Sequence, residues 1–327
     1  MDDSLPALCE IIHGLGERLP RRDTVALIQS VLLKQMILLV HRLQKAAILH
    51  NNQYISVKHV LYVLKDHKVT IIRILSYYYL KDIILKLSKI SKLGSIEELE
   101  KRKKGKKSQL QGLLKDDMVD NITNVEDESL KLDPAAALAA IDFTTKDPSS
   151  PSPTSTNVKC IFSKLRNTIA ELKLSINITE DEVKKANEAR LMRVNDISIL
   201  LSASGYEGFE MCRRKSFHGR LGDKLLIQVQ DVLPWDITIN SQVKDILMFL
   251  AKETINCLID RVFVIRNCHD ICDETNKKII KKTKYRSILV HEITAVTSQF
   301  WKIPLSKIHN PYKEDDTFFN EQLIFDS

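Results

Sequence analysis

The chain has little that would interrupt a helix and little that would cross-link one segment to another. Neither glycine nor proline occurs between Arg21 and Leu93. Because these two residues are the usual breakers of helices, that stretch is predicted to be helical almost throughout. The six cysteines are scattered without regular spacing, which argues against a disulfide framework and favours a reducing compartment. The first ten residues are acidic where a signal peptide would be basic, so secretion is not expected.

Long apolar runs and catalytic motifs are also missing. The most apolar stretch, residues 25–40, is broken by Gln29, Ser30, Lys34 and Gln35, so we expect no membrane span. The sequence has no nucleophile elbow, no glycine-rich phosphate loop and no paired-histidine metal spacing. We therefore expect no enzymatic activity, no metal and no cofactor. A net charge of +7 on 327 residues is mild; it favours acidic partners without identifying one.

What is present is a succession of amphipathic segments. A short one around Leu8–Leu15 ends at Gly16, and Asp23 is placed to cap a much longer one. Apolar residues recur at helical spacing along this second segment as far as Ala47. The N-terminal third is therefore predicted to contain a short helix, a loop and a long helix.

The polar stretch that follows predicts the end of the long helix. Asn51 and Asn52 are turn formers, the Tyr54–Ile55 pair favours a strand, and Ser56 can cap a short helix through Leu64. A further helix is predicted over Val69–Ile90. Short helix, loop, long helix, strand-like loop and short helix is the order of a histone fold, here followed by an extra helix.

The last third repeats this order. "GRLGDKLLIQVQDVL" at 219–233 predicts a short helix, Asn240 can cap a long one, and a polar loop leads to a short helix over Ile288–Phe300. Two other helical segments are predicted before it, over Ile161–Leu174 and Glu180–Ser202. The chain is thus predicted to contain two copies of one architecture.

Each long helix has apolar residues on more than one face, which a single copy cannot cover. A second copy that crosses it head to tail would cover them, and here both copies are on one chain. We therefore predict an all-α protein with two histone folds paired intramolecularly. The expected domains are an N-terminal histone fold with an extra helix (1–92), a basic and acidic disordered linker (93–160), a helical connecting segment (161–216) and a C-terminal histone fold (217–327).

Several patches, in this order, resemble one protein family. They are "VLLKQMI" at 31–37, "YISVKHVLYVLK" at 54–65, Arg73-x-Leu75-x-Tyr77-x4-Asp82, Tyr206-x2-Phe209-x3-Arg213-x2-Ser216-Phe217, and "ILMFLAKETINCLIDRVFVIR" at 246–266. Together they resemble the suppressor of Ty three family of transcription initiation proteins, which are SAGA-complex subunits with two histone folds in one chain. The last patch is the most specific.

The resemblance implies a nuclear coactivator subunit that binds the TATA-binding protein and helps to deliver it to promoters for RNA polymerase II. It would sit beside other histone-fold subunits of a SAGA-type complex and would touch DNA only weakly or indirectly. Each half also resembles one member of a histone-fold pair in the general factor TFIID, which is the nearest rival identity. A DNA-binding histone-fold module, held by Arg18, Arg21 and Arg22 in the first loop, is the third possibility.

The chain departs from the family at one loop. The loop arginine of the family and its partner aspartate fall on Gln53 and His67 here. The charge-assisted clamp of the family would be replaced by a neutral hydrogen bond between these two residues, or by Gln53 with the adjacent Asp66.

Two acidic residues are the candidate contacts for the TATA-binding protein. Glu253 and Asp260 are seven residues apart, so they share one face of the long helix, and the apolar stripe leaves that face off the core. They would form an acidic surface for a basic partner. Alternatively, they are ordinary solvated charges with basic neighbours at Lys252 and Arg261.

A run of basic residues opens the predicted linker. In "KRKKGKK" the charged residues are Lys101, Arg102, Lys103, Lys104, Lys106 and Lys107. The run is a candidate nuclear localisation signal. A solvated linker and a nucleic-acid contact are the alternatives.

Overall fold

The computed structural model describes residues 4–102, 161–174, 180–233, 238–272, 286–301 and 323–325. Within these ranges the chain forms ten helices and two very short strands. The prediction of an all-α protein is therefore confirmed.

The N-terminal third follows the predicted order. Its elements are α1 (Ser4–Gly14), α2 (Arg22–Leu49), β1 (Tyr54–Ile55), α3 (Val57–Val63) and α4 (Lys68–Arg102). Helix α2 ends just before Asn51, whose φ of 53° lies in the left-handed region that asparagine tolerates. Its N-cap is Arg21 rather than Asp23, which lies in the first turn and accepts a hydrogen bond from the Thr24 N–H.

The loop before α3 is held by a histidine that the sequence did not single out. The Ser56 N–H donates to Nδ1 of the buried His59, and Asn52 Nδ2 lies 3.0 Å from His59 Nε2. Gln53 is exposed, whereas the His67 ring packs edge-on against Phe325. His59 therefore organises the loop that the resemblance assigned to Gln53 and His67.

Helix α4 is longer than predicted. It continues to Arg102, past residue 92 where we placed the domain boundary, because a single glycine at position 94 does not stop a helix. Lys101 and Arg102 are its last residues, and Lys103, Lys104, Lys106 and Lys107 lie outside the described residues.

The rest of the described chain also matches the predicted segments. Its elements are α8 (Ile161–Glu171), α9 (Glu180–Ile199), α10 (Ala203–Arg214), α11 (Arg220–Gln230), β2 (Thr238–Ile239), α12 (Ser241–Cys272) and α14 (Val290–Trp301). As predicted, Asn240 caps α12, with its Oδ1 accepting the Gln242 N–H at 3.0 Å. Helix α10 and strand β2 are the elements among these that were not predicted.

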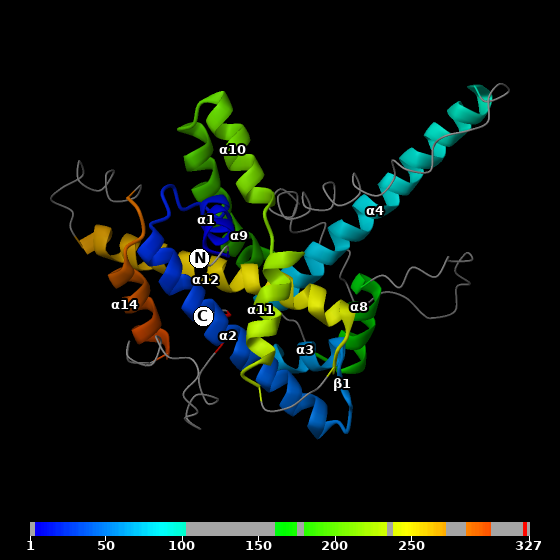
Figure 1. Cartoon of the computed structure of the whole chain (residues 1–327), viewed down its shortest axis with the longest axis horizontal. Coiled ribbons are helices and arrows are strands. Elements are labelled where there is room, and N and C mark those ends of the chain that lie inside the picture. Colours follow the sequence, from blue (N-terminus) through cyan, green and yellow to red (C-terminus); the bar gives the residue numbers. More distant parts are fainter. Residues whose placement is uncertain are drawn as a thin grey trace.

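Two of the long helices, α2 and α12, cross and pack against each other (Figure 1). At one end β1, which follows α2, pairs in parallel with β2, which precedes α12. At the other end the loop before α2 meets the residues that precede α14. There the Ile288 N–H donates to Glu17 Oε1 at 3.2 Å, and Thr24 Oγ1 donates to the Ile288 carbonyl at 2.9 Å. The segment after α2 therefore contacts the segment before α12, and the start of α2 with its preceding loop contacts the segment after α12.

Helix α2 lies at the centre of the core. Five consecutive residues, Met36 to Val40, expose none of their surface, so this helix is covered on every side. One continuous apolar cluster joins it to α12, α11 and α14. By length and composition α2 is the one described helix that could cross a membrane, but 78% of its most apolar window is buried inside the fold. That is the burial of a core helix.

Candidate partner-binding surface

The face of α12 that carries Glu253 and Asp260 is covered by another helix. Arg190 of α9 places both Nη atoms 2.9 Å from the two carboxylate oxygens of Glu253, and its Nε lies 2.6 Å from Asp260 Oδ2. Arg73 of α4 donates a further hydrogen bond to Glu253 Oε1 at 2.7 Å. The side chains of Arg190 and Glu253 are only 6% and 5% exposed. Paired hydrogen bonds between guanidinium and carboxylate are among the strongest polar contacts in proteins.

A second arginine of α9 extends this cluster. Arg193 Nη1 lies 2.8 Å from Asp260 Oδ1, its Nη2 donates to Asn256, and its Nε donates to the Leu15 carbonyl. The guanidinium therefore ties α9 to α12 and to the loop after α1. We call Arg73, Arg190, Arg193, Glu253 and Asp260 the arginine–carboxylate cluster.

The charged groups of the cluster shift one another's pKa values. Burial alone would raise the pKa of Glu253, but the positive charges of Arg190 and Arg73 outweigh it and hold that pKa below its ordinary value. The pKa of Asp260 is lowered in the same way by Arg190 and Arg193, against the effect of burial. Both carboxylates are therefore charged at neutral pH. Burial, followed by the charge of Glu253, raises the pKa of the neighbouring Cys257 thiol to about 12, so that thiol stays protonated.

The expected exposed acidic surface is therefore wrong. Glu253 and Asp260 do share one face of α12, as their spacing predicted, but α9 covers that face. The alternative of solvated charges is wrong as well, since Glu253 is 5% exposed and Lys252 is 7% exposed. The residues missed were Arg190 and Arg193. Two arginines three positions apart in a segment predicted to be helical were the available signal.

Lys252 secures the next helix. Its Nζ donates to the carbonyls of Arg213 and Lys215, where α10 ends. The last carbonyls of a helix lack partners within it, and a cation there is favourable. Gly14 of α1 also lies so close to α10 that a Cβ would stand 2.4 Å from the Cys212 carbonyl oxygen. The C-terminal end of α10 is thus held by contacts with α12 and α1.

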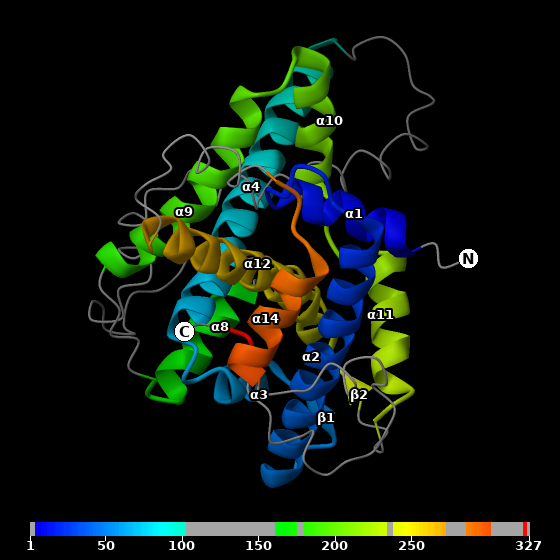
Figure 2. The same ribbon diagram turned by 90° about the vertical axis from the view of Figure 1, so that its left-hand side faces the viewer.

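Helices α9 and α10 form a hairpin that projects from the body (Figure 1 and Figure 2). Val194, Ile197 and Phe209 form a small core of its own, which is separate from the main one. Ser202 caps α10 by accepting the Gly205 N–H. The hairpin is therefore an ordered protrusion, fixed at its base by the arginine–carboxylate cluster and by Lys252.

The hairpin exposes large apolar side chains. Ile199 is 80% exposed and Leu200 is 50% exposed, both where α9 turns into α10. Met192, seven residues before Ile199 on the same face of α9, is 56% exposed, and Tyr206 and Met211 of α10 are also exposed. Apolar residues gathered on a protrusion are typical of a surface that another protein covers.

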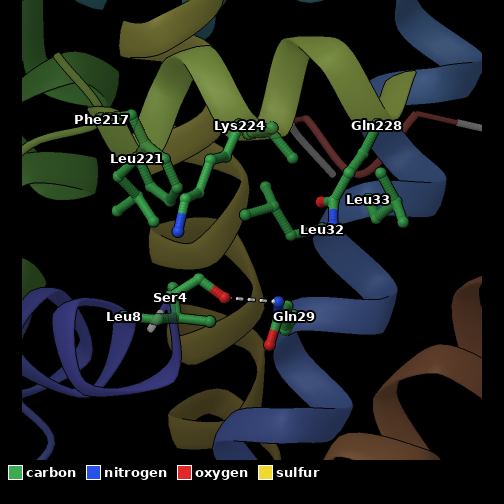
Figure 3. Close-up of a pocket in the computed structure, with 10 residues that line it drawn as sticks. Ser4, Leu8, Gln29, Leu32, Leu33, Phe217, Leu221, Lys224 and Gln228 are labelled. Carbon is green, nitrogen blue, oxygen red and sulfur yellow. Dashed lines mark hydrogen bonds between the residues drawn. The ribbon is translucent and has the colours of Figure 1, made fainter. Parts of the chain in front are cut away.

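A pocket lies where α1, α2 and α11 meet (Figure 3). Ser4 of α1 accepts a hydrogen bond from Gln29 of α2 at its edge, and Lys224 and Gln228 reach it from α11. The remaining lining residues are apolar: Leu8, Leu32, Leu33, Phe217, Leu221 and Leu225. The lining is thus mainly apolar, with Ser4, Gln29, Lys224 and Gln228 as its polar residues.

The loop contact at the α14 end carries exposed arginines. Arg18 and Arg22 lie in and after the first loop, and Arg286 precedes α14 beside it. Arg21 pairs with Asp23, and Arg286 pairs with Glu292, which also holds Arg266. Within the described residues, no group of three or more histidine, cysteine, aspartate or glutamate side chains is arranged to hold a metal ion.

Comparisons with protein-family models, with curated proteins and with solved structures found no match to this chain.

Proposed function

We propose that this chain is a histone-fold coactivator subunit of a SAGA-type complex that binds the TATA-binding protein and helps to deliver it to promoters in the nucleus. The observation that carries the proposal is the reciprocal loop pairing around the crossed α2 and α12. Two histone folds in one chain, joined head to tail, would produce this arrangement, and the sequence patches resemble a family with that organisation.

The two halves of the chain share one core. The apolar surface of α2 is covered in part by α12, α11 and α14, so the halves are not two independent domains. Halves joined by one core offer fixed surfaces to other subunits. Its pairing is intramolecular, so further histone-fold partners would dock on its outside.

The surface for the TATA-binding protein is assigned to the α9–α10 hairpin. Glu253 is buried against Arg190 of α9, and Asp260 pairs with Arg190 and Arg193 with 27% of its side chain exposed, so the two do not form an open acidic surface while α9 is in place. The exposed apolar residues at the tip of the hairpin remain accessible. Reversal of charge at Glu253 would disturb the fold and is therefore a poor test of partner binding.

The test is a pull-down of purified TATA-binding protein with the full chain. Ile199→Glu places a charge at the tip of the hairpin and is expected to lower capture at least tenfold, a loss of about 1.4 kcal/mol in binding. Ile227→Glu, at a 56% exposed position on α11, is the matched control and is expected to bind as the unaltered chain does. Equal capture by both variants would remove the hairpin from the interface, and no capture by the unaltered chain would remove the proposed partner.

The rival identity is a TFIID-type histone-fold subunit. Affinity purification of the tagged full chain from nuclear extract distinguishes the two complexes. Co-purified acetyltransferase-complex subunits support the SAGA-type assignment, whereas general-factor subunits without the acetyltransferase would replace it.

DNA binding is a second candidate, favoured by the exposed Arg18 and Arg22 beside Arg286. Phosphate contacts from these groups would give duplex affinity that falls steeply with added salt. Absence of duplex binding by the full chain at low salt eliminates this candidate.

A further inference from the structure

Three residues near the end of the chain return to its core. Leu323–Phe325, which we call the return segment, follows residues 302–322, which lie outside the described ranges. Each of the three exposes 5% or less of its surface, and all belong to the main apolar cluster. In Figure 1 the segment is the short red stretch near α2 and α14.

The backbone of this segment is bound by side chains from two different helices. The Ile324 N–H donates to Oε1 of Gln35 on α2 at 3.0 Å, and Arg261 of α12 reaches the Ile324 carbonyl at 3.5 Å. Gln35 is 2% exposed and lies in an otherwise apolar part of α2. Hydrogen bonds to both backbone groups of Ile324, together with burial of its neighbours in the apolar cluster, hold the segment in place.

The wall of the site also favours a particular peptide chemistry. The Phe325 ring stands edge-on to His67, with ring centroids 5.9 Å apart. Leu323 and Ile324, which precede this ring, are buried in the same apolar cluster. A peptide with two aliphatic residues followed by an aromatic residue matches these contacts.

We propose that Gln35, Arg261 and His67 form part of a peptide-binding site that the return segment occupies in cis. The occupant that the site accepts in trans is a peptide with the same aliphatic–aliphatic–aromatic pattern. The tethered segment has a high local concentration, so it excludes a free peptide until its own contacts are weakened. This inference does not depend on the coactivator role.

The experiment offers the fluorescently labelled peptide FNEQLIFDS, residues 319–327, to the full chain and follows fluorescence anisotropy. The probe is expected to bind a full chain that carries Ile324→Ala and Phe325→Ala at least about tenfold more tightly than the unaltered chain. The same peptide with a methyl group on its isoleucine amide nitrogen cannot donate to Gln35. It is expected to bind the variant at least about tenfold more weakly than the unmodified peptide.

Each outcome decides the proposal. Equal affinity of the variant and the unaltered chain, equal affinity of the methylated peptide, or equal binding of a scrambled peptide would overturn it. If the variant loses its helical circular dichroism signal, recovery of that signal on addition of the peptide supports a site filled in trans. Failure to recover overturns it.

Discussion

The arginine–carboxylate cluster makes a quantitative prediction about stability. It holds three guanidinium groups, those of Arg73, Arg190 and Arg193, against two carboxylates, Glu253 and Asp260. Glu253→Gln leaves three buried or nearly buried cations facing a single carboxylate. Loss of one partner from a buried ion pair costs about 3–5 kcal/mol, because the remaining charge is uncompensated. We expect that decrease in the free energy of unfolding.

Arg190→Met removes the central residue of the cluster, yet we expect it to cost less. It leaves two arginines for two carboxylates, with Arg73 still on Glu253 and Arg193 still on Asp260. Since no buried charge is left alone, the expected loss is about 1–3 kcal/mol. The double variant keeps the original excess of one cation, so its cost should fall short of the sum of the two single costs by at least about 1 kcal/mol.

The measurement is urea unfolding of the full chain followed by far-ultraviolet circular dichroism. Asp223→Asn is the matched control, because the Asp223–Lys244 pair has a similar distance of 2.6 Å but side chains that are about half exposed. A surface pair of this kind should contribute less than about 1 kcal/mol. If Arg190→Met proves more costly than Glu253→Gln, or if the two costs are additive, the account of compensated buried charge is wrong.

Three further predictions concern other parts of the fold. Burial, with the charges of Lys45 and Arg42, lowers the pKa of His41 to about 4 from about 6.5. The unfolded chain therefore binds this proton first as pH falls, and stability should drop by about 3 kcal/mol between pH 6.5 and 4. His41→Gln should abolish that part of the pH dependence, and the same change at the exposed His291 should not. Gly14→Ala should destabilise the chain by about 1–3 kcal/mol, because its Cβ would overlap the α10 backbone. Gly208→Ala, where the new Cβ meets nothing within 4 Å, should be neutral or stabilising by up to about 1 kcal/mol in thermal unfolding. Finally, the buried Cys257 should resist iodoacetamide in the native chain and react in urea, and fast native labelling detected by mass spectrometry would contradict its burial.

Local rules predicted most of the helices from the sequence. The absence of glycine and proline from Arg21 to Leu93, the Asn51–Asn52 turn and the Asn240 cap place α2, α3 and α12 close to where they are observed. These signals depend only on neighbouring residues, so they survive without knowledge of the fold. The C-terminal end of α4 was predicted too early. The sequence becomes linker-like after residue 92, but the helix continues to Arg102.

The candidate site could be predicted only in part. The spacing of Glu253 and Asp260 correctly puts them on one face of α12, but spacing cannot say what covers a face. The covering residue, Arg190, is 63 positions from Glu253 in the sequence. The burial of Ile324 depends in the same way on Gln35, which lies 289 positions away. Whether residues 103–160 form the predicted linker stays a prediction, since they lie outside the described ranges.

The fully covered α2 has a consequence for synthesis of the chain. Part of its cover, α12, is complete only when roughly 220 further residues have been added, which takes about 10–45 s at ordinary rates of translation. During that interval α2 has α1 and α3 as native partners but lacks its contacts with α11, α12 and α14, and the apolar surface left uncovered favours aggregation. We expect the nascent chain to need a ribosome-associated chaperone until its second half emerges.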